Sequence, residues 1–172
     1  MGRELAWVCG LVPEDVSTGI VRISKEANRD IGLPETVFRF PLHISMKKSF
    51  STDDFAGVKA AVVPFIEERG SVECRTGAVA RHKGMLWLPV EAKGAIAPWH
   101  EALDGLLERE FSIPISGFDR NFAPHVSLFT KGSPEQLDTM YNRLVGALDP
   151  LQFTLRTFVI GASGHKDAFI SV

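Results

Sequence analysis

The sequence predicts an α/β or α+β fold, because strand-like and helix-like segments alternate along the whole chain. The chain has 172 residues, of which 45% are hydrophobic and 23% charged, as is ordinary for a soluble globular protein. This length suits one domain with a sizeable core, and we expect residues 1–172 to form a single domain. Its two halves also resemble each other, which predicts an internal duplication.

In the first half, apolar runs predict the strands, and apolar residues at helical spacing predict the helices. Val16, Ile20, Ile23 and Ala27 fall on one side of the first helix. Ser51 or Thr52 is the expected N-cap of the second helix, and Gly70 ends it. The expected elements are a strand at 5–12, a helix at 14–29, a strand at 40–50, a helix from 51 or 52 to 68, and strands at 71–80 and 85–91, the last two flanking a His82-Lys83-Gly84 turn.

The second half repeats this order. Ser133 is the expected N-cap of its second helix, and Pro134 then occupies the first helical position, where its missing N–H has no intrahelical partner to lose. The expected elements are a helix at 95–111, a strand at 124–130, a helix from 134 to about 148, and strands at 151–161 and 168–172.

Two tetrapeptides carry the duplication most clearly: His-Ile-Ser-Met at 43–46 and His-Val-Ser-Leu at 125–128, which are 82 residues apart. Other residues repeat around them, namely Phe40 and Phe122 before the motifs, Ser51 and Ser133 after them, and the His82-Lys83 and His165-Lys166 pairs. We infer two related units. If an approximate two-fold axis relates them, both motifs face one shared cleft.

Each motif presents an imidazole and a hydroxyl on one side of a strand, because residues i and i+2 share a face. Two histidines suit phosphodiester chemistry, since one can be neutral while the other is charged near neutral pH. The serine hydroxyls can donate to the non-bridging phosphate oxygens. We therefore predict that His43, Ser45, His125 and Ser127 form a phosphate-handling site.

Paired His-x-Ser/Thr motifs about eighty residues apart in a duplicated chain resemble those of the 2H phosphoesterase superfamily, which includes 2'-5' RNA ligase-like proteins and cyclic nucleotide phosphodiesterases. The resemblance covers nearly the whole chain. It implies a bilobal α+β fold with antiparallel sheets lining a central cleft and helices outside. It also implies metal-independent opening of 2',3'-cyclic phosphates or reversible cleavage of 2'-5' bonds. By this resemblance, His43 and His125 are the acid/base pair, and Ser45 and Ser127 bind the phosphate.

Further residues could contact the substrate. Lys47 and Phe129 have the strand parity of the motif histidines, and Lys131 follows the second motif. We assign them as candidate substrate-binding residues. The alternatives are that the lysines are solvated at the strand ends, and that Phe129 packs in the core instead of stacking on a base. His82 and His165 are expected in solvated turns, with a phosphate contact at the cleft rim as the alternative, and His100 is expected to be structural.

The composition of the chain limits which partners and which cellular location we expect. The net charge of −2 argues against a long duplex, so a nucleotide or short RNA end is the expected ligand. The two cysteines and the absence of a signal-like segment predict a cytoplasmic protein that is neither secreted nor membrane-bound. We expect a monomer without a cofactor or metal. The alternatives are a non-catalytic module that binds RNA ends or cyclic nucleotides, and the same chemistry on a non-nucleotide cyclic phosphate or signalling oligonucleotide.

Overall fold

The computed structural model describes residues 4–92, 94–163 and 167–172. Strands and helices alternate as the sequence predicts, and the fold class is α+β. In chain order the elements are β1 (Glu4–Leu11), α1 (Glu14–Asn28), the 3-10 helix η1 (Thr36–Arg39), β2 (His43–Thr52), α2 (Phe55–Glu67), β3 (Val72–Thr76), β4 (Ala80–His82), β5 (Met85–Glu91), α3 (Ile96–Phe111), α4 (Gly117–Arg120), β6 (His125–Phe129), α5 (Pro134–Val145), β7 (Gln152–Leu155), β8 (Thr157–Ala162) and β9 (Ala168–Ser171).

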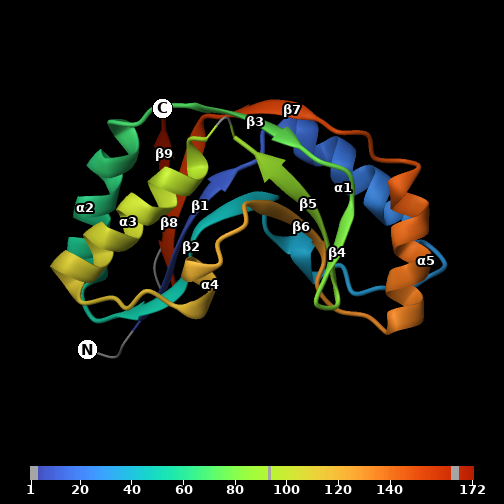
Figure 1. Ribbon diagram of the computed structural model, residues 1–172, viewed down its shortest axis with the longest axis horizontal. Coiled ribbons are helices and arrows are strands. Elements are labelled where there is room, and N and C mark those ends of the chain that lie inside the picture. Colours follow the sequence, from blue (N-terminus) through green and yellow to red (C-terminus); the bar gives the residue numbers. More distant parts are fainter. Residues whose placement is uncertain (1–3, 93, 164–166) are drawn as a thin grey trace.

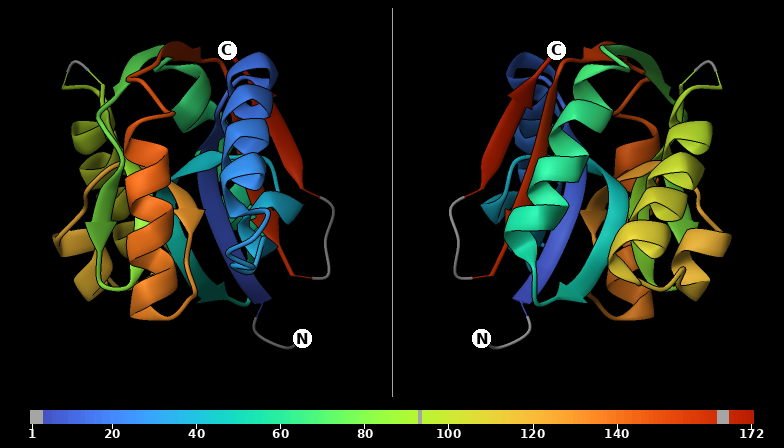
Figure 2. Two further views of the ribbon diagram at one scale, coloured as in Figure 1. Left: turned by 90° about the vertical axis from the view of Figure 1, so that its right-hand side faces the viewer. Right: turned by 90° about the vertical axis from the view of Figure 1, so that its left-hand side faces the viewer.

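The nine strands of the described chain form a curled antiparallel sheet in the order β7-β3-β5-β6-β2-β1-β8-β9, with β4 pairing with β5. The two motif strands, β2 and β6, lie side by side at its centre. We call β2, β1, β8 and β9 the first-motif half-sheet and β6, β5, β3 and β7 the second-motif half-sheet. Helices α2 and α3 pack on the first, and α1 and α5 on the second, at opposite ends of the molecule (Figures 1 and 2).

The duplication is visible in this arrangement, because β1-α1-β2-α2-β3 is followed by β5-α3-β6-α5-β8 when the unmatched elements η1, β4, α4 and β7 are left aside. The third strand of each repeat joins the other repeat's half-sheet: β3 pairs with β5, and β8 pairs with β1. At the centre, Ile44 pairs with Val126. Their separation equals the 82-residue offset of the motifs, so a local two-fold axis passes through this pair.

Both motif strands contain a β-bulge at the same place. On β2, Ser45 pairs with Cys9 and Lys47 pairs with Val8, so Met46 is the extra residue. On β6, Ser127 and Phe129 pair with consecutive residues of β5, so Leu128 is the extra residue. A bulge inserts one residue into the alternation of faces, so the side chains beyond it no longer follow the parity of those before it.

Several elements differ from the sequence prediction: η1 and α4 were not expected, and the strand expected at 71–80 is two strands, β3 and β4. Strand β2 continues to Thr52, so α2 begins later, and its N-cap is Asp54, whose Oδ1 accepts a hydrogen bond from the Gly57 N–H at 2.8 Å. The strand predicted at 151–161 is two strands that break at Arg156, because β7 pairs with β3 and β8 with β1. The Ser133 cap is confirmed by a capping box with Gln136.

The core lies between the sheet and its helices and includes the inward residues of both motifs. Ile44, Met46, Val126 and Leu128 are all fully buried. These apolar side chains anchor the motif strands and leave the alternate residues on the opposite face. Among the described residues, no helix has the length and apolar character needed to cross a bilayer.

Candidate active site

The four motif residues lie together on one face of the central strand pair, each of them half-buried. Because Ile44 opposes Val126 in antiparallel register, His43 lies opposite Ser127, and Ser45 lies opposite His125. Directly opposed Cβ atoms are about 5 Å apart, and diagonal neighbours are about 7–8 Å apart. The two imidazoles are diagonal neighbours, and that spacing leaves room for one phosphate between them.

Both imidazoles are held in the same way. His43 Nδ1 lies 2.9 Å from the Pro41 carbonyl oxygen, and His125 Nδ1 lies 2.7 Å from the Ala123 carbonyl oxygen. A carbonyl oxygen can only accept, so Nδ1 carries a proton in each ring. Nε2 is then left to accept a proton in the neutral ring or to donate one in the charged ring. Each motif thus presents one Nε2 for acid/base work.

The environment lowers the proton affinity of both rings. Burial lowers the pKa of His43 below its ordinary value, and the bond to Pro41 opposes this shift. Burial also lowers the pKa of His125, the bond to Ala123 opposes the shift, and the positive charges of His43 and His82 lower it further. Partial burial disfavours the charged imidazolium. The influence of His43 on His125 places the two rings within electrostatic reach of each other.

Trp87 lies beside the motif residues, and the sequence analysis did not single it out. It lies on β5 opposite Ser127, and its ring is 4.1 Å from the His125 ring. On its other side His82 stacks on it at 4.6 Å with an interplanar angle of 12°. His82 is therefore exposed at the end of β4, as a turn residue would be, but it also belongs to the wall beside His125. The alternation of residues 85–91 places Trp87 on the half-exposed face, yet only the strand order shows which motif it faces.

A cavity of about 270 Å³ adjoins the first motif and is lined in part by Trp7, Cys9, Phe40 and the motif residues His43 and Ser45. Phe40 meets the His43 ring edge-on, with the ring centroids 5.2 Å apart. Burial, together with the nearby Asp167, raises the pKa of the Cys9 thiol to about 12. This thiol is therefore an unreactive wall of the cleft rather than a nucleophile.

Both predicted substrate contacts that directly follow the bulges are buried, and the stacking role expected of Phe129 is corrected. Lys47 is only 2% exposed and Phe129 is fully buried. Each follows its bulge, so the alternation of faces no longer groups it with the preceding histidine and serine. Lys47 still lines the small cavity beside His43 and Ser45, although its side chain is buried. Phe129 packs edge-on against Phe38, with ring centroids 5.4 Å apart, and has no face available for a nucleobase.

The remaining candidates have different outcomes. Lys131 lies exposed just after β6, where a contact with substrate stays a prediction. His165 lies outside the described residues. His100 is buried on α3 and stacks on Phe122 at 3.8 Å, in agreement with the structural role expected for it.

Lys47 belongs to a buried ionic cluster that the sequence did not reveal. Its Nζ lies 2.6 Å from Asp104 Oδ1 and 2.8 Å from Asp119 Oδ2. Burial alone would raise the pKa of Asp119, but hydrogen bonds from Lys47 and Ser116 lower it. His100, Asp104 and Asp119 could together ligate a metal ion. The Lys47 ammonium already supplies a cation to both carboxylates, so these residues fit an internal ion pair better than a metal site.

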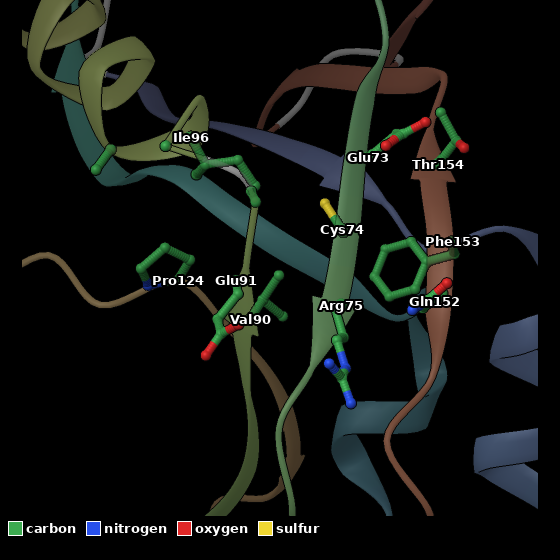
Figure 3. A pocket seen from close by; sticks show the side chains of 13 residues that line it. Glu73, Cys74, Arg75, Val90, Glu91, Ile96, Pro124, Gln152, Phe153 and Thr154 are labelled. Carbon is green, nitrogen blue, oxygen red and sulfur yellow. The ribbon is translucent and has the colours of Figure 1, made fainter.

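Each motif also has a larger cavity beside it. One, of about 860 Å³, lies where β3 and β5 separate beyond the Arg75–Glu91 pair, and the Cys74 sulfur points into this gap (Figure 3). It includes Pro124, which directly precedes His125. The other, of about 710 Å³, includes Leu42, which directly precedes His43. The repeat has therefore duplicated the cavity as well as the motif.

Solved structures with the same fold come from several organisms. TT0787 of Thermus thermophilus matches with a TM-score of 0.63 at 15% identity, over 98% of this chain and 94% of that one. LigT of E. coli, complexed with 3'-AMP, matches with a TM-score of 0.66 at 10% identity, over 99% and 96%. Usb1 of Kluyveromyces marxianus matches with a TM-score of 0.57 at 15% identity, over 98% of each chain. No curated protein sequence matches significantly.

The fold and the paired His-x-Ser motifs define the class of two-histidine phosphoesterases. The family model of the 2'-5' RNA ligase superfamily matches residues 13–166, so it spans both motifs and most of both repeats. The chain belongs to this superfamily, within the 2H phosphoesterases. Its fold is that of LigT.

Proposed function

We propose that this protein is a metal-independent phosphoesterase that opens 2',3'-cyclic phosphates or reversibly cleaves 2'-5' bonds of nucleotides or short RNA ends. One observation carries the proposal. Two imidazoles with the same Nδ1–carbonyl bond lie diagonally across one strand pair, and a serine hydroxyl lies opposite each. This arrangement supplies a base, an acid and two hydrogen-bond donors around a single phosphate.

In hydrolysis of a 2',3'-cyclic phosphate, the neutral imidazole takes a proton from water through Nε2 while the water oxygen attacks phosphorus. The bond from phosphorus to one ribose oxygen breaks, and the charged imidazole donates its Nε2 proton to that oxygen. Ser45 and Ser127 donate to the non-bridging oxygens, where negative charge accumulates. One water is consumed, and the histidines exchange protonation states, which solvent then restores.

The comparisons support the substrate class. The family carries the name of 2'-5' RNA ligases, and E. coli LigT has been crystallised with 3'-AMP, NADP+ and ATP. Ligation at this site is the reverse of 2'-5' cleavage, and the sequence has no GxxxxGK[ST] phosphate-binding loop. Energy stored in the cyclic ester would therefore drive the joining reaction.

The test is turnover of 2',3'-cyclic nucleotides and 2'-5' dinucleotides in EDTA. We expect turnover by the wild type, and we expect His43→Ala and His125→Ala each to lower kcat/KM by about 10²–10⁴. Full dependence on a divalent metal, or an active double variant, would overturn the mechanism. Binding of 3'-AMP without turnover of any substrate would favour a binding module, and turnover of only non-nucleotide cyclic phosphates would redirect the substrate class.

A further inference from the structure

We propose that Lys47 is a positioning residue for the first motif, and that the buried cluster of Lys47, His100, Asp104 and Asp119 fixes the β2 bulge that directs His43 and Ser45 into the cleft. In its effect on catalysis this inference rests on the proposed function. It assigns a role to buried charged side chains outside the two motifs.

The bulge leaves a backbone group that needs a partner. Met46 is unpaired on β1, because the register steps from Ser45 to Lys47. Buried carbonyl oxygens without a hydrogen bond are costly. His100 on α3 supplies the partner, with its Nδ1 at 2.7 Å from the Met46 carbonyl oxygen. The helix thus holds the strand at the point where it departs from regular pairing, one residue beyond Ser45.

The side chain of Lys47 also holds the bulge of β2 in place. Its ammonium reaches Asp104 on α3 and Asp119 on α4, and all three residues are at most 6% exposed. Asp119 is itself fixed, because Ser116 and Asp119 form a capping box at the start of α4. A buried charge deprived of its partner is strongly unfavourable, so these contacts hold β2 to both helices. The strand cannot return to regular pairing without breaking them.

His100 connects the bulge to both helices. Its Nε2 lies 3.1 Å from the Asp119 carbonyl oxygen and 3.4 Å from Asp104 Oδ2, while Nδ1 faces the Met46 carbonyl oxygen. One buried ring therefore contacts α4, its own helix α3 and the bulged residue of β2.

In the second repeat an uncharged residue occupies the position that corresponds to Lys47. Phe129 takes the place of Lys47 after the matching bulge, and it packs on Phe38 of η1 instead of on carboxylates. The two repeats therefore hold equivalent bulges with different chemistry, ionic at the first motif and aromatic at the second. Removing the charges of the buried cluster should therefore displace His43 and leave His125 in place.

The test compares two variants. Lys47→Met removes the ammonium and strands two carboxylates. The triple variant Lys47→Met/Asp104→Asn/Asp119→Asn removes the stranded charges at similar shape. We expect Lys47→Met to lose thermal stability and about 100-fold in kcat with KM within about threefold, because misplacement of about 1 Å can cost this much. We expect the triple variant to regain its unfolding midpoint while kcat stays low.

Met140→Ala is the control for lost stability, because Met140 is buried in α5, which packs on the other half-sheet. It should lower the midpoint and leave kcat within about threefold. NMR supplies a readout independent of turnover: in the triple variant the His43 ring signals should shift and the His125 signals should not. Recovery of kcat together with the midpoint, or an unchanged His43 signal, would overturn the proposal. Absence of wild-type turnover would instead count against the proposed function. The His43 signal would still test the positioning role proposed for Lys47.

Discussion

Replacing His82 by glutamine should raise the pKa of His125 and displace one limb of the pH–rate profile. The His82 ring stacks on Trp87, and the Trp87 ring lies tilted against His125, with centroid spacings of 4.6 and 4.1 Å, so the two imidazoles are separated by no more than about 9 Å. At that distance and in a water-like dielectric, two unit charges repel by about 0.5 kcal/mol. His82 is exposed, so this low figure applies.

The sign follows from the direction of the shift. The charged His82 disfavours the charged form of His125 and lowers its pKa. Removing that charge therefore moves the His125 pKa up, toward its ordinary value, while His43 should not respond. If the lower limb of the bell-shaped profile moves, His125 is the base; if the upper limb moves, it is the acid. This variant would thus assign roles that the symmetry of the two motifs conceals.

The assay is an NMR titration of the two imidazoles together with kcat/KM against pH. At an ionic strength of about 0.01 M the shift should be nearly complete, and in about 1 M salt it should vanish, because the Debye length falls from about 30 Å to about 3 Å. His82→Arg is the matched control, since it keeps a positive charge. A His125 pKa that stays the same or falls in His82→Gln at low salt would refute the reasoning.

Three other predictions follow from the site and its support. Ser45→Ala and Ser127→Ala should each lower kcat/KM by about 10²–10³ as a phosphate donor is lost, whereas Ser51→Ala on the exposed end of β2 should leave the rate unchanged; equal rates in all three would contradict the donor role. Phe129→Ala should lower the free energy of unfolding by about 3–5 kcal/mol in urea titrations, and a loss below about 1 kcal/mol would mean that the ring is not packed as described. Cys9, with its pKa of about 12, should resist alkylation at pH 8 until the protein is unfolded, which mass spectrometry would show; rapid labelling of the native protein would disprove its burial.

The sequence was sufficient to predict that the four motif residues share one face, because that prediction needs only local geometry and the repeat. Alternation within a strand places His43 with Ser45 and His125 with Ser127, and the fixed offset relates the two pairs. The bulges break the alternation one residue later. A bulge depends on which strand pairs with which and in what register, so nothing within residues 43–47 could show that Lys47 turns inward.

The same reason explains the other differences. Trp87 faces His125 because β5 lies beside β6, and the break at Arg156 marks where the chain leaves one half-sheet for the other. In the sequence Asp104 falls in an expected helix and Asp119 between expected elements, and nothing there shows that Lys47 lies between them. The periodicity of a single sequence therefore reveals the duplicated motif, but it does not reveal which distant segments of the chain pair with each other.

Each repeat contributes its third strand to the other repeat's half-sheet. This exchange determines how a chain of half this length could fold. A chain ending after β3 would carry one motif and one strand whose partner it lacks, since β3 pairs with β5 and β1 pairs with β8. Two copies would complete each other as a swapped homodimer, with β2 beside its own copy on the two-fold axis. The catalytic cleft would then belong to neither subunit, and joining the copies into one chain would make its assembly independent of protein concentration.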